Sequence, residues 1–126
     1  MDGLAVTVLL RHDLPDGSSH YDWLLEQSGR AHGALMTFRV QERIDQPGVE
    51  SFKGIRLPDH RWEYLTYQGE VSGDRGRVTR VARGSCRFEA ISDERFRVAV
   101  TFEASQVWEG RREGAGETWV FRATPA

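Results

Sequence analysis

Alternation between apolar and polar residues is the feature of this sequence that most constrains its fold. In RFRVAVTFE, residues 95–103, the apolar side chains of Phe96, Val98, Val100 and Phe102 fall on every second position. Successive side chains of a β-strand point to opposite faces, so this period of two predicts a strand with one buried face. Similar runs occur at residues 4–10, 20–26, 34–42, 62–71, 76–82, 85–91 and 117–123.

Residue pairs that favour turns separate most of these runs: Ser28-Gly29, Pro47-Gly48, Gly73-Asp74 and Arg83-Gly84. About seven or eight short strands joined by turns predict an all-β, mainly antiparallel chain folded as a small β-barrel or a sandwich. Residues 43–59 lack the alternation. We expect them to form the one long irregular connection, with room for a short helix.

The chain reads as a single domain spanning residues 1–126, because it contains no repeat and no change of composition that would mark a linker. Hydrophobic residues make up 39% and charged residues 29%, which excludes an intrinsically disordered chain. The net charge of −2 argues against a protein that coats nucleic acid through bulk charge. All basic residues except Lys53 are arginine, which suits phosphate binding, but the codon usage of a GC-rich genome explains it better than a selected phosphate surface does.

The single cysteine and the first residues of the chain bear on where in the cell the protein is found. Cys86 is the only cysteine, so the chain has no internal disulfide and no thiolate zinc cluster, and we expect it to be a packed strand residue. The apolar run at residues 4–10 is far shorter than the roughly 20 residues that span a bilayer, and it has no basic segment before it. These features predict a cytoplasmic protein.

The stretch RHDLPDGSSHYDWLLE, residues 11–26, places two histidines and an aspartate around a polar loop. On a strand, His20 and Asp22 lie on one face, and Tyr21 and Trp23 lie on the core face. His12 can meet the first two if the loop closes a hairpin. Two imidazoles and a carboxylate suit manganese, iron or zinc. His-x-Asp pairs are also common on exposed strands that bind nothing, and both interpretations remain open from the spacing.

A second group lies in LPDHRWEYLTYQGEVSGDRGRV, residues 57–78. His60 and Tyr64 would share a face if this stretch is a strand. The alternative is an ordinary tyrosine at a barrel rim beside a solvated histidine. His32, the remaining histidine, is expected at the surface beside a hairpin turn.

The two motifs together resemble the 3′-phosphoesterase domain of bacterial DNA ligase D, a DNA end-joining repair enzyme, and more closely its small stand-alone relatives. The resemblance covers about residues 6–88. It implies a compact β-barrel whose crevice holds a divalent metal ion, typically manganese. It also implies a hydrolase that removes a terminal ribonucleoside and then a 3′ phosphate from DNA 3′ ends on a primer-template, in non-homologous end joining and with a ligase or polymerase as partner.

By position, the resemblance implies that His12, His20 and Asp22 bind the metal ion and that His60 and Tyr64 engage the phosphate. It makes Asp13 and Glu26 candidates for orienting the ligands, although Glu26 fits a plain surface role equally well.

The sequence departs from the family pattern at three points. The family usually has arginine where this chain has Leu24, it often has a polar residue where this chain has Leu10, and its loop between the two histidines is shorter. A cation that contacts phosphate is therefore missing. Candidates to replace it are Arg61, Arg75 and Arg77.

Two other functions fit parts of the pattern. His20, Asp22 and the distant His60 resemble the metal ligands of iron and 2-oxoglutarate oxygenases, but the chain is small for that fold and lacks an arginine at the co-substrate spacing after His60. The other alternative is a barrel without catalytic activity that binds DNA ends or a ligase or polymerase, which Leu24 favours.

Overall fold

The computed structural model of the chain describes residues 5–27 and 35–124. Within these ranges the backbone forms nine strands and one short 3₁₀-helix. The elements are β1 (Ala5–Asp13), β2 (Ser19–Glu26), β3 (Leu35–Val40), β4 (Ser51–His60), η1 (Trp62–Leu65), β5 (Gly69–Glu70), β6 (Arg77–Ile91), β7 (Arg95–Thr101), β8 (Ser105–Arg112) and β9 (Thr118–Thr124). Nowhere in these ranges does a helix reach the length and apolar character that crossing a bilayer requires.

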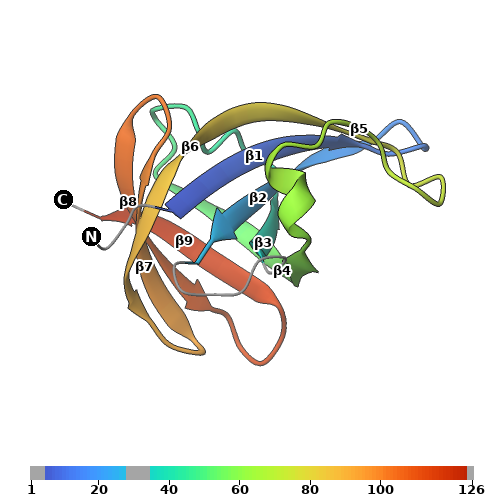
Figure 1. Cartoon of the computed structure of the whole chain (residues 1–126). Helices are drawn as coiled ribbons and strands as arrows, with labels where there is room; N and C mark the ends of the chain where they lie inside the picture. Colours follow the sequence, from blue (N-terminus) through green and yellow to red (C-terminus); the bar gives the residue numbers. More distant parts are fainter. Residues whose placement is uncertain (1–4, 28–34, 125–126) are drawn as a thin grey trace.

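Eight of the strands close into an antiparallel β-barrel (Figure 1). Their order is β1-β2-β3-β4-β9-β8-β7-β6, and β6 then pairs with β1 to complete the ring. The two-residue strand β5 pairs only with β6 and lies outside the ring. The prediction of an all-β, antiparallel barrel is therefore confirmed.

Aromatic side chains fill the interior of the barrel, which we call the inner core. The rings of Trp23, Phe38 and Phe121 contact one another with centroids 5.0 to 6.1 Å apart. The indole N–H of Trp23 donates to the Thr7 hydroxyl at 2.9 Å, so its one polar atom is satisfied. Because the interior is a packed core, a binding site has to lie on an outer surface.

The prediction of an irregular connection at 43–59 is wrong for its second half, because β4 begins at Ser51. The alternation there is hidden because Gly54 occupies an inward position. A Cβ atom on Gly54 would lie only 3.2 Å from the Phe121 ring, so the ring occupies the space that a side chain would need. The part before Ser51 has no strand or helix, as expected.

Two other glycines inside strands interrupt the alternation in the same way. Residues 76–82 and 85–91 are not two strands, because β6 runs unbroken through Gly84. A Cβ atom on Gly84 would meet the carbonyl oxygen of Thr101 at 1.9 Å, so the backbones approach too closely for any other residue. Strand β8 was not predicted, since Gly110 interrupts its pattern where a Cβ atom would lie 2.6 Å from Phe121.

The predicted strand at 62–71 is also wrong. Its first part is the 3₁₀-helix η1, closed by backbone bonds such as that from the Thr66 N–H to the Glu63 carbonyl at 3.1 Å, and only Gly69 and Glu70 form a strand. Leu65 is buried, whereas its neighbours in η1 are partly or fully exposed. Packing of Leu65 against the barrel wall, together with the partly buried Trp62 and Tyr64, overrides the strand-like composition of the segment.

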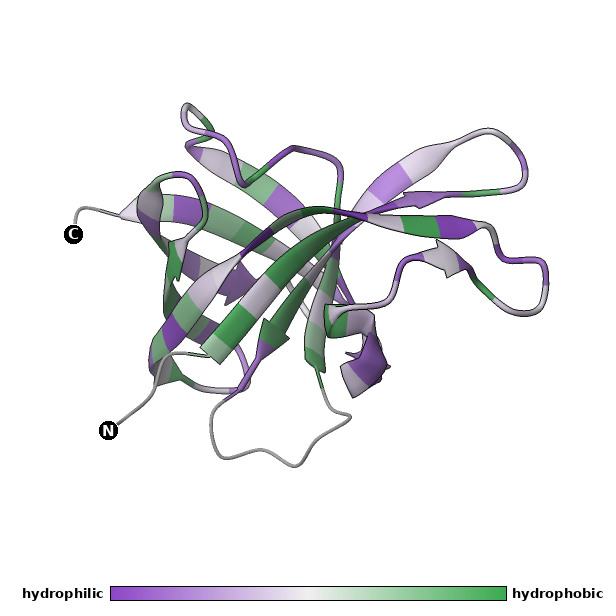
Figure 2. Cartoon of the chain, turned by 45° about the horizontal axis from the view of Figure 1, so that its top comes forward, coloured by the Kyte–Doolittle hydropathy of each residue, from purple (hydrophilic) through white to green (hydrophobic). Residues whose placement is uncertain are grey.

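Residues 61–76, which we call the cover segment, pack on the outer face of β1 and β2. Figure 1 shows η1 lying over these strands, and Figure 2 shows apolar positions, coloured green, alternating with polar ones along the barrel strands. The apolar contacts beneath the cover segment form a second cluster, the outer cluster: Val8, Leu10, Leu24, Leu35, Leu65, Val71 and Val78. It lies on the face that also carries His20 and Asp22, and it therefore borders the candidate site.

The predicted turn at Ser28-Gly29 and the surface position of His32 lie outside the described residues.

Candidate functional site

The β1–β2 hairpin brings together the three residues predicted to bind metal. His12 is directly opposite His20 in the strand register, and Leu10 is opposite Asp22. The turn is closed by a backbone bond from the Leu14 N–H to the Ser18 carbonyl at 2.8 Å. This pairing is the hairpin on which the prediction depended.

The ligand atoms of His12, His20 and Asp22 all lie within 4.8 Å of one another. His20 Nε2 is 3.1 Å from Asp22 Oδ1, and His12 Nδ1 is 3.6 Å from Asp22 Oδ2. The side chains of His20 and Asp22 are only 5% and 4% exposed, so water has little access to them. The three side chains thus form a compact and largely buried group of two imidazoles and one carboxylate.

Two buried polar atoms in this group have no hydrogen-bond partner: His20 Nε2 and Asp22 Oδ1. Their separation is short, but the angles do not suit a hydrogen bond. An unsatisfied buried polar group costs about 1 to 3 kcal/mol, so such atoms are rare unless they serve a purpose. A cation shared by both atoms would satisfy them.

The hydrogen bond of His12, the third residue of the group, also favours a bound cation. His12 Nε2 is 2.7 Å from the carbonyl oxygen of Arg75, which can only accept, so Nε2 carries the proton of the neutral ring. The lone pair of Nδ1 then faces an oxygen of Asp22. A metal-binding histidine usually donates its second ring N–H to a carbonyl or carboxylate in this way. The three residues therefore fit a divalent metal ion such as manganese, iron or zinc.

The electrostatics of Asp22 keep it ionised. Burial by itself raises the pKa of the carboxyl group, but the imidazoles of His20 and His60 outweigh burial and hold the pKa well below its usual range. Asp22 is therefore a carboxylate near neutral pH, the form that binds metal ions.

His60 and Tyr64 also lie at this site, although not on one strand face as predicted. His60 ends β4, Tyr64 belongs to η1, and the turn at Arg61 brings their rings to a centroid distance of 5.5 Å. His60 Nδ1 donates to the Pro58 carbonyl at 3.2 Å, and Nε2 faces Asp22 Oδ2 at 3.8 Å. His12, not His60, completes the compact ligand group, contrary to the ligand set of the oxygenase alternative.

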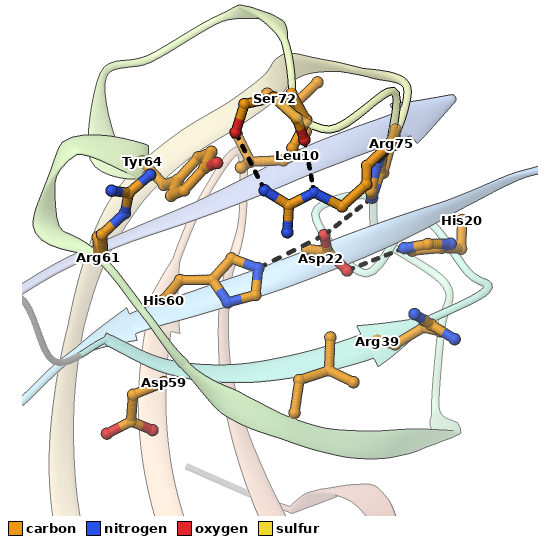
Figure 3. A pocket seen from close by; sticks show the side chains of 14 residues that line it. Leu10, His20, Asp22, Arg39, Asp59, His60, Arg61, Tyr64, Ser72 and Arg75 are labelled. Atoms are coloured by element: carbon orange, nitrogen blue, oxygen red, sulfur yellow. Dashed lines mark hydrogen bonds and ion pairs between the residues drawn. The ribbon is translucent and has the colours of Figure 1, made fainter. Parts of the chain in front are cut away.

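These residues line a pocket of about 480 Å³, within the range of small-molecule sites. Figure 3 shows Asp22 at its centre, His20 to one side and His60 to the other, with Tyr64 and Arg75 above. The lining residues are Leu10, His12, His20, Asp22, Arg39, Leu57, Asp59, His60, Arg61, Tyr64, Val71, Ser72, Arg75 and Val78.

Two of the three arginines considered for phosphate binding line the pocket. Arg61 lies with its guanidinium carbon 5.9 Å from the centre of the Tyr64 ring, and Arg75 enters from the loop after β5. Arg77 does not line the pocket and pairs with Glu70 at 3.1 Å.

Arg39 is a pocket residue that the sequence reasoning missed. It pairs with Asp22 in the β2–β3 register, between the buried residues Phe38 and Val40. The alternation of residues 34–42 already placed it on the opposite face from those two, so the signal was present. What the sequence lacked was the register that puts this face beside Asp22.

Among the described residues, the side-chain contacts of Asp13 and Glu26 lie away from the three candidate ligands. Asp13 accepts a hydrogen bond from Arg11 Nε at 2.9 Å and, as the neighbour of His12 on a strand, points to the other face. Glu26 accepts from the Val6 backbone N–H at 2.8 Å and is absent from the pocket lining. Glu26 therefore ties the start of β1 to the end of β2.

Leu24 and Cys86 are both buried and do not line the pocket. Leu24 has no exposed surface and packs in the outer cluster. Cys86 is part of the inner core, where burial first and the charge of Glu26 second raise the pKa of its thiol to about 12. As expected, Cys86 is a packed strand residue.

No protein-family model and no curated protein matches this chain. The resemblance to the 3′-phosphoesterase domain of DNA ligase D therefore stands on the two sequence motifs.

Proposed function

We propose that this protein is a metal-dependent phosphoesterase that processes the 3′ ends of DNA in repair. The observation that carries the proposal is the buried group of His12, His20 and Asp22, which includes a nitrogen and an oxygen atom without hydrogen bonds and lines a pocket together with three arginines. A site that combines metal ligands with several guanidinium groups suits a phosphate substrate.

His12, His20 and Asp22 would hold the divalent metal ion, for which manganese is the family's usual choice. Bound there, the ion supplies a positive charge that stabilises phosphate oxygens and lowers the pKa of water. The imidazoles of His12 and His20 keep their orientation through the hairpin, and the carbonyl of Arg75 fixes the tautomer of His12.

His60 and Tyr64 provide the proton donors. Since Pro58 holds the Nδ1 proton of His60, Nε2 is the atom that can carry a proton toward a phosphate or a departing oxygen. The Tyr64 hydroxyl can donate to a phosphate oxygen as charge develops on it. The guanidinium groups of Arg39, Arg61 and Arg75 surround the same space and favour an anionic ligand.

The assignment to DNA 3′ ends rests on the resemblance of the two motifs. The substrate classes that follow are a 3′ phosphate and a terminal ribonucleoside on a primer-template, and the partner class is a ligase or polymerase of non-homologous end joining in the cytoplasm.

The test uses a primer-template that ends in a 3′ phosphate or a single ribonucleotide, with manganese present. The wild type should release phosphate or nucleoside. His60→Ala should slow turnover by about a hundredfold or more, the usual contribution of a positioned proton donor, and Tyr64→Phe should slow it as well. Both variants should keep their affinity for manganese, measured by calorimetry, because neither residue belongs to the ligand group.

Tyr67→Phe is the matched control for Tyr64→Phe. The Tyr67 ring packs on Tyr64, but its hydroxyl donates to the Glu70 carbonyl and Tyr67 does not line the pocket. It should turn over substrate like the wild type. His20→Ala should abolish metal binding. Equal turnover in the His60 and Tyr64 variants would contradict their roles, and undiminished metal binding by His20→Ala would refute the metal site.

The burial of Leu24 favours a second candidate, a DNA-end-binding module without catalytic activity. The family's arginine is absent at this position, and the cover segment closes over the leucine that replaces it. Binding of a 3′-phosphate strand without turnover in any divalent metal would support this alternative.

A further inference from the structure

The loop that follows β5 is held against the end of β1. Gly73 and Gly76 have positive φ angles of 78° and 98°, and the Val71 N–H donates to the Gly76 carbonyl at 2.8 Å. A Cβ atom at Gly76 would lie 2.0 Å from the backbone oxygen of Asp13, so only glycine fits there. This loop places Arg75 beside the ligand hairpin.

The Arg75 side chain is fixed by contacts within its own loop. Its Nε donates to the Ser72 carbonyl at 2.6 Å, and one terminal nitrogen, Nη2, lies 3.2 Å from the Ser72 hydroxyl. Among the described residues, its guanidinium forms no ion pair with a carboxylate. Figure 3 shows the guanidinium directed across the pocket, above Asp22 and His60. Donors that remain available are thus held in place and face the space where a phosphate would bind.

Position 24 cannot supply this cation. Leu24 lies on the same face of β2 as Asp22, but it has no exposed surface and packs in the outer cluster together with Leu65 of η1. A cation that reaches the pocket must therefore come from outside β2. In Figure 3, Ser72 and Arg75 of the loop after β5 lie above Asp22 of β2.

We propose that the Arg75 side chain binds phosphate in this pocket. It would replace the arginine that the family pattern places at the position of Leu24. The proposal rests on the proposed phosphoesterase function and names the contact that binds its substrate. Arg75 also serves the ligand group through its main chain, because its carbonyl accepts the Nε2 proton of His12. One residue thereby links the phosphate to the metal ligands.

The two roles of Arg75 can be separated, because a side-chain substitution leaves the carbonyl in place. Orthophosphate binding to the manganese-loaded protein, measured by calorimetry, reports on the side chain. Manganese affinity reports on the main chain. Arg75→Ala should weaken orthophosphate binding by about tenfold to a hundredfold, the usual effect of losing a charge-assisted hydrogen bond, and leave manganese affinity unchanged.

Three further variants complete the design. Arg75→Lys keeps the charge without the planar fork and should lie between the wild type and Arg75→Ala. Arg75→Gln keeps a polar side chain but is shorter and carries no charge; it should match Arg75→Ala, which guards against a folding defect in either one. Arg77→Ala is the matched control, because Arg77 is two residues away, pairs with Glu70 and does not line the pocket. It should bind orthophosphate like the wild type.

Folded Arg75→Ala and Arg75→Gln proteins that bind orthophosphate as tightly as the wild type would overturn the proposal. A wild type that binds no orthophosphate would overturn it as well. Binding that depends on Arg75, in a protein that hydrolyses no 3′-phosphate primer, would uphold the role of Arg75 and refute the phosphoesterase function. The two proposals can therefore fail separately.

Discussion

Neighbouring residues of β2 occupy two different environments. Trp23 points into the inner core, where aromatic rings surround it and its single polar atom has a partner. Asp22 points outward, beneath the pocket, where one of its oxygen atoms and a nitrogen of His20 are buried without hydrogen bonds. Both side chains are almost fully buried. The inner face thus contributes stability, whereas the outer face keeps polar atoms in a state that favours a ligand.

Two buried acids show the same contrast. The thiol of Cys86 lies in the inner core, and burial followed by the charge of Glu26 raises its pKa. Burial also acts to raise the pKa of Asp22, but two imidazoles reverse the effect and lower it. Burial alone therefore does not determine whether a group is charged. The neighbours on the outer face make a buried charge stable, and the neighbours on the inner face do not.

Trp23→Ala should produce the largest effect on stability. It removes a fully buried indole from the inner core, and such truncations cost about 3 to 5 kcal/mol. Urea unfolding measures the loss. Trp62→Ala is the matched control, because Trp62 is only partly buried at the edge of the outer cluster, and its loss should be clearly smaller. Equal losses would contradict the view that the inner core stabilises the chain more than the outer cluster does.

Leu24→Arg should have the next largest effect. The leucine has no exposed surface, and a guanidinium in its place would have to be desolvated or push the cover segment away. We expect a loss of about 2 to 4 kcal/mol in the free energy of unfolding. Leu24→Met, which nearly conserves volume, should lose less than about 1.5 kcal/mol. An arginine variant as stable as the methionine variant, with tighter binding of a 3′-phosphate strand, would show that position 24 can still face the pocket.

The smallest effect should be the pH dependence due to Cys86. Its pKa is about 12 in the folded chain, against about 8.5 in an unfolded one, so the folded chain keeps a proton that the unfolded chain loses. The stabilising contribution is complete below about pH 8.5 and is lost as the pH rises toward 12, with a slope of at most about 1.4 kcal/mol per pH unit. Urea unfolding of the wild type and Cys86→Val between pH 8 and 10 isolates this slope. Parallel pH profiles for the two proteins would contradict a buried thiol.

Local alternation predicted the antiparallel strands of a barrel or a sandwich, and it predicted the hairpin that carries the candidate ligands. His12, His20 and Asp22 lie on one hairpin, so the strand period and the turn are sufficient to bring them together. Strands β4 and β8 and the continuity of β6 could not be predicted in this way. Gly54, Gly84 and Gly110 interrupt the pattern for reasons of space, and that space is set by Phe121 and Thr101 from distant parts of the chain.

The position of Arg75 depends on contacts that are even more distant in the sequence. Gly76 packs against the backbone of Asp13, and the Arg75 carbonyl meets His12, 63 residues earlier in the chain. The strand-like composition of 62–71 also concealed η1, whose position depends on the burial of Leu65. Sequence patterns therefore indicated candidate site residues, and the register and the cover segment decided which of them share the pocket.

The strand order also affects how the chain folds while it is being synthesised. Strands β7, β8 and β9 fill the gap between β6 and β4, and they leave the ribosome after every residue of the pocket. Because domains emerge with their N-terminal part first, β1 can pair with β2 and β6 while the barrel is still open. Until β9 reaches β4, both sides of the gap present unpaired strand edges, which are sites of aggregation. We therefore expect the hairpin that carries the candidate metal ligands to form early, and the nascent chain to depend on its last third to remain in solution.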